Sequence, residues 1–218
     1  MQKYFIMRNF ENWETQDLEI EFGLYRNFKS QLLEEWLQAT TTLNEYEMQR
    51  ADKLKDKIFK FSDYWNEDEL KMQAISPIID LVDYNADGFT VFSNRPLSAK
   101  INGIELGGRV DFLISKGQQK PIPPYFFIHE YKQETKKGSS DPKGQLLSEL
   151  LVAQERNKEA NFPIYGCYVV GRSWFFVVLQ GKEYAVTNAI NASDDDIVKV
   201  IAMLRQVRLN IFKILNKN

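Results

Sequence analysis

The chain has 218 residues, of which 44% are hydrophobic and 27% are charged. This length and composition predict one large globular domain, or a core with an added lobe, and exclude a disordered chain. The formal net charge of −2 lacks the basic excess of a strong non-specific nucleic-acid binder.

One cysteine, Cys167, cannot form an internal disulfide, and one histidine, His129, cannot build a histidine-rich zinc site. Any metal would therefore be held by oxygen ligands, which favour magnesium, manganese or calcium. No stretch approaches the roughly 20 consecutive apolar residues of a membrane span, and the N-terminus lacks the features of a secretory signal. We expect a cytoplasmic protein that does not enter the membrane.

Residues 1–65 carry helical rather than strand patterns. Phe28 to Gln38 places leucines and Trp36 at helical spacing, and Leu43 to Phe61 is a charged segment with an apolar stripe. We expect a helical N-terminal extension over residues 1–65.

The next helix begins at Asn66, a good N-cap residue, and carries acidic residues in its first turn, where the helix dipole favours them. Its apolar stripe extends to Val82, and Pro77 is expected to kink it. The segment from Asn85 to Gly88 is typical of a turn.

The rest of the chain alternates between strands and helices. Strands are predicted at 88–94, 104–115, 125–134, 164–170 and 174–179, and helices at 145–157 and 193–215. The order predicts an α/β domain over residues 66–190 whose central helix crosses over between strands, with a C-terminal helix at 191–218 that packs on it.

Charge is unevenly distributed along this pattern. From Arg95 to Gln145 there are nine Lys or Arg residues against five Asp or Glu residues. This middle segment is therefore the expected surface for an anionic partner, and Lys136, Lys137 and Lys143 flank a loop that could touch a nucleic-acid backbone.

Glu130 and Lys132 lie two apart on the strand at 125–134, so their side chains share one face. Charges at the end of an apolar strand are costly unless they are paired or bound to something, and a simple ion pair is the plainest interpretation. Asp111 interrupts a second apolar strand, and adjacent strands would bring its carboxylate close to Glu130. Because like charges repel, a divalent ion between them is expected, and Lys132 could then hold or deprotonate an attacking water.

At this point the sequence resembles the PD-(D/E)xK nuclease superfamily over roughly residues 66–180. The resemblance is carried by Asp111, by Glu130-Tyr131-Lys132 and by Gln145, which follow a helix that begins with acidic residues. It implies a restriction-endonuclease-like core with a central mixed β-sheet flanked by helices. The proline of the family motif is replaced by Val110.

The resemblance also implies roles for individual residues. Asp111 and Glu130 would be ligands of Mg²⁺ or Mn²⁺, Lys132 would be the catalytic lysine, and Gln145 would orient Lys132 or a phosphate. The acidic residue of the first helix is either Glu67 or Glu69.

The expected function is that of a Mg²⁺- or Mn²⁺-dependent endonuclease, a hydrolase that cleaves phosphodiester bonds of nucleic acid, DNA in particular, in defence, repair or mobile-element biology. Such proteins often work as dimers, so a homodimer is expected by analogy. The alternative is a catalytically inactive nuclease-fold module that binds nucleic acid or protein. A third interpretation is a generic α/β protein in which Glu130 and Lys132 form an ion pair.

Overall fold

The computed structural model describes residues 7–84, 88–134, 141–158 and 162–216. Most of the predicted turn that begins at Asn85 and the loop lysines Lys136 and Lys137 lie outside these residues. Of the helices within the described ranges, none is both long enough and apolar enough to cross a membrane.

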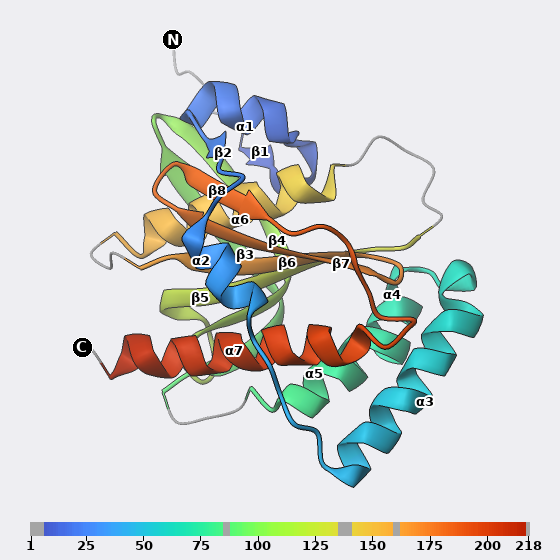
Figure 1. The fold of residues 1–218 in the computed structure, drawn as a ribbon. Helices are drawn as coiled ribbons and strands as arrows, with labels where there is room; N and C mark the ends of the chain where they lie inside the picture. Colours follow the sequence, from blue (N-terminus) through green and yellow to red (C-terminus); the bar gives the residue numbers. More distant parts are fainter. Residues whose placement is uncertain (1–6, 85–87, 135–140, 159–161, 217–218) are drawn as a thin grey trace.

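Within the described residues, the strands form one mixed nine-stranded sheet, drawn edge-on in Figure 1. They are β1 (Arg8–Asn9), β2 (Tyr25–Arg26), β3 (Thr90–Ile101), β4 (Ile104–Lys116), β5 (Ile122–Lys132), β6 (Ile164–Val170), β7 (Ser173–Gln180), β8 (Glu183–Val186) and β9 (Ile190–Asn191). The order across the sheet is β1-β4-β5-β6-β7-β8-β2, with β3 paired to β4 and β9 to β7.

Helices cover both faces of this sheet (Figure 1). They are α1 (Thr15–Phe22), α2 (Gln31–Leu37), α3 (Glu45–Phe61), α4 (Glu67–Leu70), α5 (Ser76–Val82), α6 (Pro142–Arg156) and α7 (Ile197–Leu215), with short 3-10 turns η1 (Phe10–Asn12) and η2 (Ser62–Tyr64). α1 and α6 lie on one face, and α5 and α7 lie on the other. The prediction of an α/β fold with a mixed central sheet flanked by helices is confirmed.

α6 connects β5 to β6, which pair in parallel, so it is the crossover helix that the sequence predicts. The helix is buried from Gly144 to Ala153, because it packs on the sheet with one side and is covered by α1 on the other. Polar side chains at the start of α6 are therefore held inside the protein.

The N-terminal segment contains two short strands that the sequence did not predict. β1 pairs in parallel with β4 on the side that also pairs with β5, beyond the point where the β5 pairing ends, and β2 pairs in parallel with β8 at an edge of the sheet. Each strand has two residues, which is too short to produce an alternating pattern. The predicted domain boundary at residue 65 stays a prediction.

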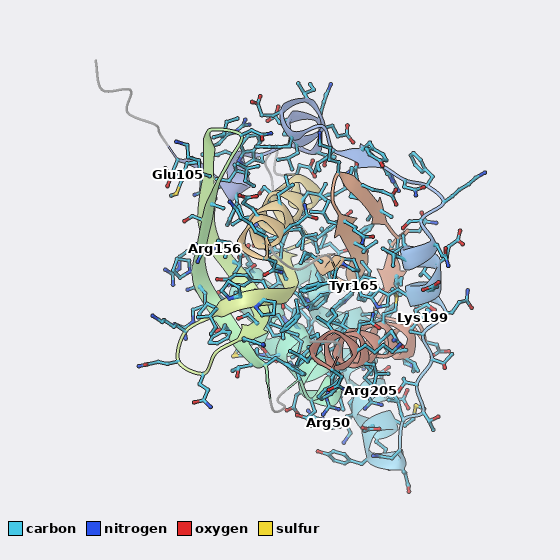
Figure 2. All side chains as sticks on the ribbon, turned by 90° about the vertical axis from the view of Figure 1, so that its left-hand side faces the viewer. Arg50, Glu105, Arg156, Tyr165, Lys199 and Arg205 are labelled. Atoms are coloured by element: carbon cyan, nitrogen blue, oxygen red, sulfur yellow. The ribbon has the colours of Figure 1, made fainter. Side chains whose placement is uncertain are left out.

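The same segment also reaches the core under α7. Trp36 packs edge-to-face on Tyr165 and Phe176 of the sheet. On α7, Lys199 and Arg205 extend toward the N-terminal segment, and the guanidinium of Arg205 donates to Oε1 of Glu47 at 2.6 Å (Figure 2). Hydrogen bonds and an ion pair therefore join the N-terminal helical segment to α7.

The helix predicted from Asn66 to Val82 is interrupted. Asn66 caps α4 as expected, but a π-helical turn, η3 (Lys71–Ile75), separates α4 from α5. The backbone N–H of Ser76 donates to the carbonyl of Lys71, five residues earlier. This wider turn leads directly into Pro77, whose ring lacks an N–H and would clash in a regular helix. Single π turns are frequent at functional sites.

Candidate active site

The candidate site lies at the point along β4 where pairing with β5 ends, before the residues that pair with β1. β5 pairs with β4 from Phe112 to Lys116, and β1 pairs with the same edge of β4 at Leu106 and Gly107. Asp111 stands at the end of the β5 pairing. Because Phe112 is opposite His129, the next residues on the two strands are Asp111 and Glu130.

Both oxygens of the Asp111 carboxylate accept hydrogen bonds. The backbone N–H of Tyr131 donates to Oδ2 at 3.0 Å, and the ammonium of Lys71 donates to Oδ1 at 2.8 Å. The first contact joins Asp111 to the end of β5, between Glu130 and Lys132. The structure therefore brings the three predicted residues of β4 and β5 together.

Glu130 and Lys132 form a buried ion pair at the end of β5. Burial, together with the repulsion of Asp111, raises the pKa of Glu130 to about 8. Burial alone would lower the pKa of Lys132, but the charge and hydrogen bond of Glu130, together with the charges of Glu67 and Asp111, raise this pKa. The Lys132 ammonium donates its hydrogen bond to Oε1 of Glu130.

A second acid, Glu149, approaches these residues from α6. The amide of Gln145 donates to Oε1 of Glu149 at 3.3 Å, while Oε1 of Gln145 and Oε2 of Glu149 are buried and have no hydrogen-bond partner among the described residues. Burial, and then the charge of Glu130, raise the pKa of Glu149 well above its ordinary value. The resemblance implies that Gln145 orients Lys132 or a phosphate. Its side-chain hydrogen bond within the described residues is to Glu149, so this role stays a prediction.

The start of α6 is fixed in place by the N-terminal segment. The Asp141 carboxylate accepts from the backbone N–H and the hydroxyl of Thr15, at 2.8 and 2.6 Å. A Cβ on Gly144 would lie 2.5 Å from the carbonyl oxygen of Trp13 and 2.7 Å from the Thr15 nitrogen. Only glycine permits this close approach, which positions Gln145 in the next place on the helix.

The two candidate acids of the first helix have different surroundings. Glu69 is exposed, and its carboxylate accepts from the backbone N–H of Asn66 at 2.8 Å as part of a capping box. Glu67 is part-buried and accepts from Lys71 at 3.0 Å. Glu67 therefore lies beside Lys71 and the candidate site, whereas Glu69 closes the helix end. Which of the two is the acid of the first helix stays a prediction.

Lys71 is the site residue that sequence reasoning missed. Its ammonium bridges Glu67, four residues earlier, and Asp111, forty residues later. The four-residue spacing from Glu67 was a usable signal for a helical ion pair. The contact with Asp111 carries no such signal, because it depends on how α4 and η3 pack against the sheet.

A cavity of about 350 Å³ opens beside Asp111 and Lys71. It is bounded by η3 and α5 on one side and by β3 and β4 on the other, and Tyr131, Ile79 and Ser93 also line it. A recess of this size next to a carboxylate can admit part of a substrate. Glu130 and Lys132 lie outside its lining.

The donor set fits a hard divalent cation bound by few protein ligands. Among the described residues, no group of three or more His, Cys, Asp or Glu side chains is arranged to hold a metal ion. Mg²⁺, however, commonly binds through one or two carboxylates and keeps several waters. Asp111 and Glu130 are the two carboxylates that could hold such an ion, since they stand opposite each other where the β4–β5 pairing ends, and Glu149 lies near enough for their charges to raise its pKa.

Comparison with known proteins does not place the chain in a family: no protein-family model matches it, and no curated protein does. The resemblance to PD-(D/E)xK nucleases therefore rests on the residues of the site and on their placement in the fold.

Proposed function

We propose that this protein is a Mg²⁺- or Mn²⁺-dependent endonuclease of the PD-(D/E)xK type with a restriction-endonuclease-like core. The observation that carries the proposal is that Asp111, Glu130 and Lys132 lie together where the pairing of β4 with β5 ends. The acid on the preceding helix, Glu67, and the crossover helix with Gln145 then approach this point from either side.

Each residue of the candidate site would have a distinct role in the reaction. Asp111 and Glu130 would hold the metal, which supplies Lewis acidity to the attacking water and the phosphodiester. Lys132 stays protonated, so it would donate hydrogen bonds to the water or to a phosphoryl oxygen and offset the charge that develops there. The Tyr131 backbone N–H would keep Asp111 oriented.

The reaction is a hydrolysis. The water oxygen forms a bond to phosphorus, and the bond from phosphorus to the leaving ribose oxygen breaks. The proton lost by the water balances the proton gained by the leaving oxygen. The attacking water releases one proton to solvent, and the leaving sugar oxygen takes up one proton from solvent.

A cleavage assay on circular DNA tests the proposal, because circles have no ends and report endonuclease activity alone. Supercoiled duplex and circular single-stranded DNA are incubated with Mg²⁺ or Mn²⁺. Asp111→Ala and Lys132→Ala should each lower the rate by at least about 100-fold. Asp195→Ala, which removes an exposed carboxylate that pairs with Lys55 outside this cavity, should cleave normally. Undiminished cleavage by either site variant would contradict the assignment.

One observation favours the inactive module as a second candidate. Both oxygens of Asp111 are engaged by protein donors, and Glu130 is paired with Lys132. A descendant of a nuclease in which lysine ammonium groups had replaced the metal would show these same contacts. It would bind no divalent ion at Asp111, so a metal titration separates the two candidates.

A further inference from the structure

The Lys71 ammonium lies where a cation bound to Asp111 would lie. It is 2.8 Å from Oδ1 of Asp111 and 3.0 Å from Oε1 of Glu67. Oδ2 of Asp111 is occupied by the backbone N–H of Tyr131. Oδ1 is thus the Asp111 oxygen that a metal could bind, and in this structure it accepts a hydrogen bond from the Lys71 ammonium.

The ammonium and a divalent ion cannot share this position. A hard cation binds an oxygen at about 2.0–2.6 Å, so it would lie within a few ångströms of the Lys71 nitrogen. Three positive charges at that separation repel strongly in a half-buried site. One cation must therefore leave when the other binds.

The Lys71 side chain has room to move away from Asp111. Its side chain is 28% exposed, it lines the cavity beside Asp111, and it lies one helical turn after Glu67. A lysine stem has several rotatable bonds, so the ammonium can leave Asp111 and remain on Glu67 without any backbone movement. Glu67 thereby keeps an ion pair with the Lys71 ammonium after the ammonium has left Asp111.

We propose that Lys71 is an internal competitor for the metal at Asp111: it neutralises Asp111 in the metal-free protein and moves onto Glu67 when Mg²⁺ or Mn²⁺ binds. This inference rests on the proposed metal site. It makes Lys71 a residue that sets the metal affinity, and it assigns Glu67 to Lys71 rather than to the metal.

Calorimetric titration of Mn²⁺ into the intact protein tests this. Lys71→Met removes the competing charge and keeps the length of the side chain, so it should bind Mn²⁺ at least about tenfold more tightly than the wild type. Lys55→Met is the matched control, because Lys55 also bridges two acids, Asp52 and Asp195, away from Asp111. It should bind Mn²⁺ as the wild type does.

The result with Asp111→Asn separates the two levels of the proposal. If binding depends on Asp111 but Lys71→Met binds no more tightly than the wild type, Lys71 is a structural ion pair and the proposed nuclease site still stands. If no Asp111-dependent binding occurs in the wild type or in Lys71→Met, both proposals fall.

A measurement on the wild type covers the case in which Lys71→Met does not fold. Nuclear magnetic resonance of the lysine side chains, with the Lys71 signal assigned through Lys71→Arg, follows a titration with Mg²⁺. The Lys71 signal should shift in step with metal binding while the Lys55 signal stays in place. An unmoved Lys71 signal at saturating Mg²⁺ would overturn the exchange.

Discussion

The ammonium of Lys71 lies 2.8 Å from Oδ1 of Asp111, although the two residues are forty positions apart. The contact joins the π turn after α4 to the middle of β4, where the β5 pairing ends, and it holds α4 against the sheet beside the candidate site. Glu67 completes the arrangement from the same helical face.

Substitutions of Glu67 and Glu69 should have different effects on stability and on cleavage. Glu69→Ala removes half of a capping box and should cost about 0.5–2 kcal/mol of stability with no loss of cleavage at permissive temperature. Glu67→Ala should alter Mn²⁺ binding and cleavage, because it removes the holder of Lys71. Urea denaturation and the circular-DNA assay measure the two effects. Loss of cleavage in Glu69→Ala with normal cleavage in Glu67→Ala would reverse the assignment.

Metal-free stability should fall as the pH rises. Burial raises the folded-state pKa of Glu149 above its ordinary value, so its neutral form is favoured in the folded protein. Its contribution to stability is therefore complete below pH 4.5 and is lost as the pH rises toward the folded pKa. Glu130, with a pKa of about 8, acts in the same direction.

Glu149→Gln keeps the shape without a titrating proton. In EDTA, the melting temperature of the wild type should drop between pH 5 and pH 9 more steeply than that of Glu149→Gln. Parallel pH profiles would show that Glu149 does not titrate inside the protein.

His129 should make the protein sensitive to acid. Its ring is enclosed by Phe112, Phe127 and Trp174, and within the part of the chain that the structure describes neither ring nitrogen has a hydrogen-bond partner. Burial lowers its pKa to about 3, so its contribution is present above pH 6.5 and is lost as the pH falls toward 3.

His129→Phe should therefore raise stability by about 1 kcal/mol at neutral pH, since two unpaired polar atoms are removed. It should also flatten the loss of stability between pH 6.5 and pH 3. Urea denaturation at several pH values checks this, and an equally steep acid transition in the variant would show that another group causes it.

Gly144→Ala should reverse the usual effect of this substitution. Alanine in a helix normally stabilises by about 0.5–1 kcal/mol relative to glycine. Here the added Cβ would collide with the backbone of Trp13 and Thr15, so we expect destabilisation by about 1–3 kcal/mol. Displacement of the start of α6 should lower cleavage as well, because Gln145 and Glu149 move with it. A stabilised, fully active variant would contradict the role of the N-terminal segment in positioning α6.

The sequence was most informative where apolar runs were long. The predicted strands at 164–170 and 174–179 match β6 and β7 closely, because both are buried runs bounded by turns. β3 extends to Ile101, well beyond its predicted end, since Arg95 to Lys100 forms an exposed hairpin arm without the apolar signature of a core strand.

The site was predictable only in part, for a similar reason. Asp111, Glu130 and Lys132 interrupt apolar strands, and such interruptions can be recognised in a sequence. Lys71 and Glu149 lie on helices whose composition is ordinary. Their importance comes from tertiary packing, which places one ammonium on Asp111 and buries one carboxylate beside Glu130.

Anomalous diffraction from crystals soaked in Mn²⁺ tests the metal site most directly, because it locates the ion without relying on activity. The account predicts a peak within about 2.0–2.6 Å of carboxylate oxygens of Asp111 and Glu130, with the Lys71 ammonium turned to Glu67. An anomalous map without a peak at Asp111, with Lys71 still in contact with Oδ1, would contradict it.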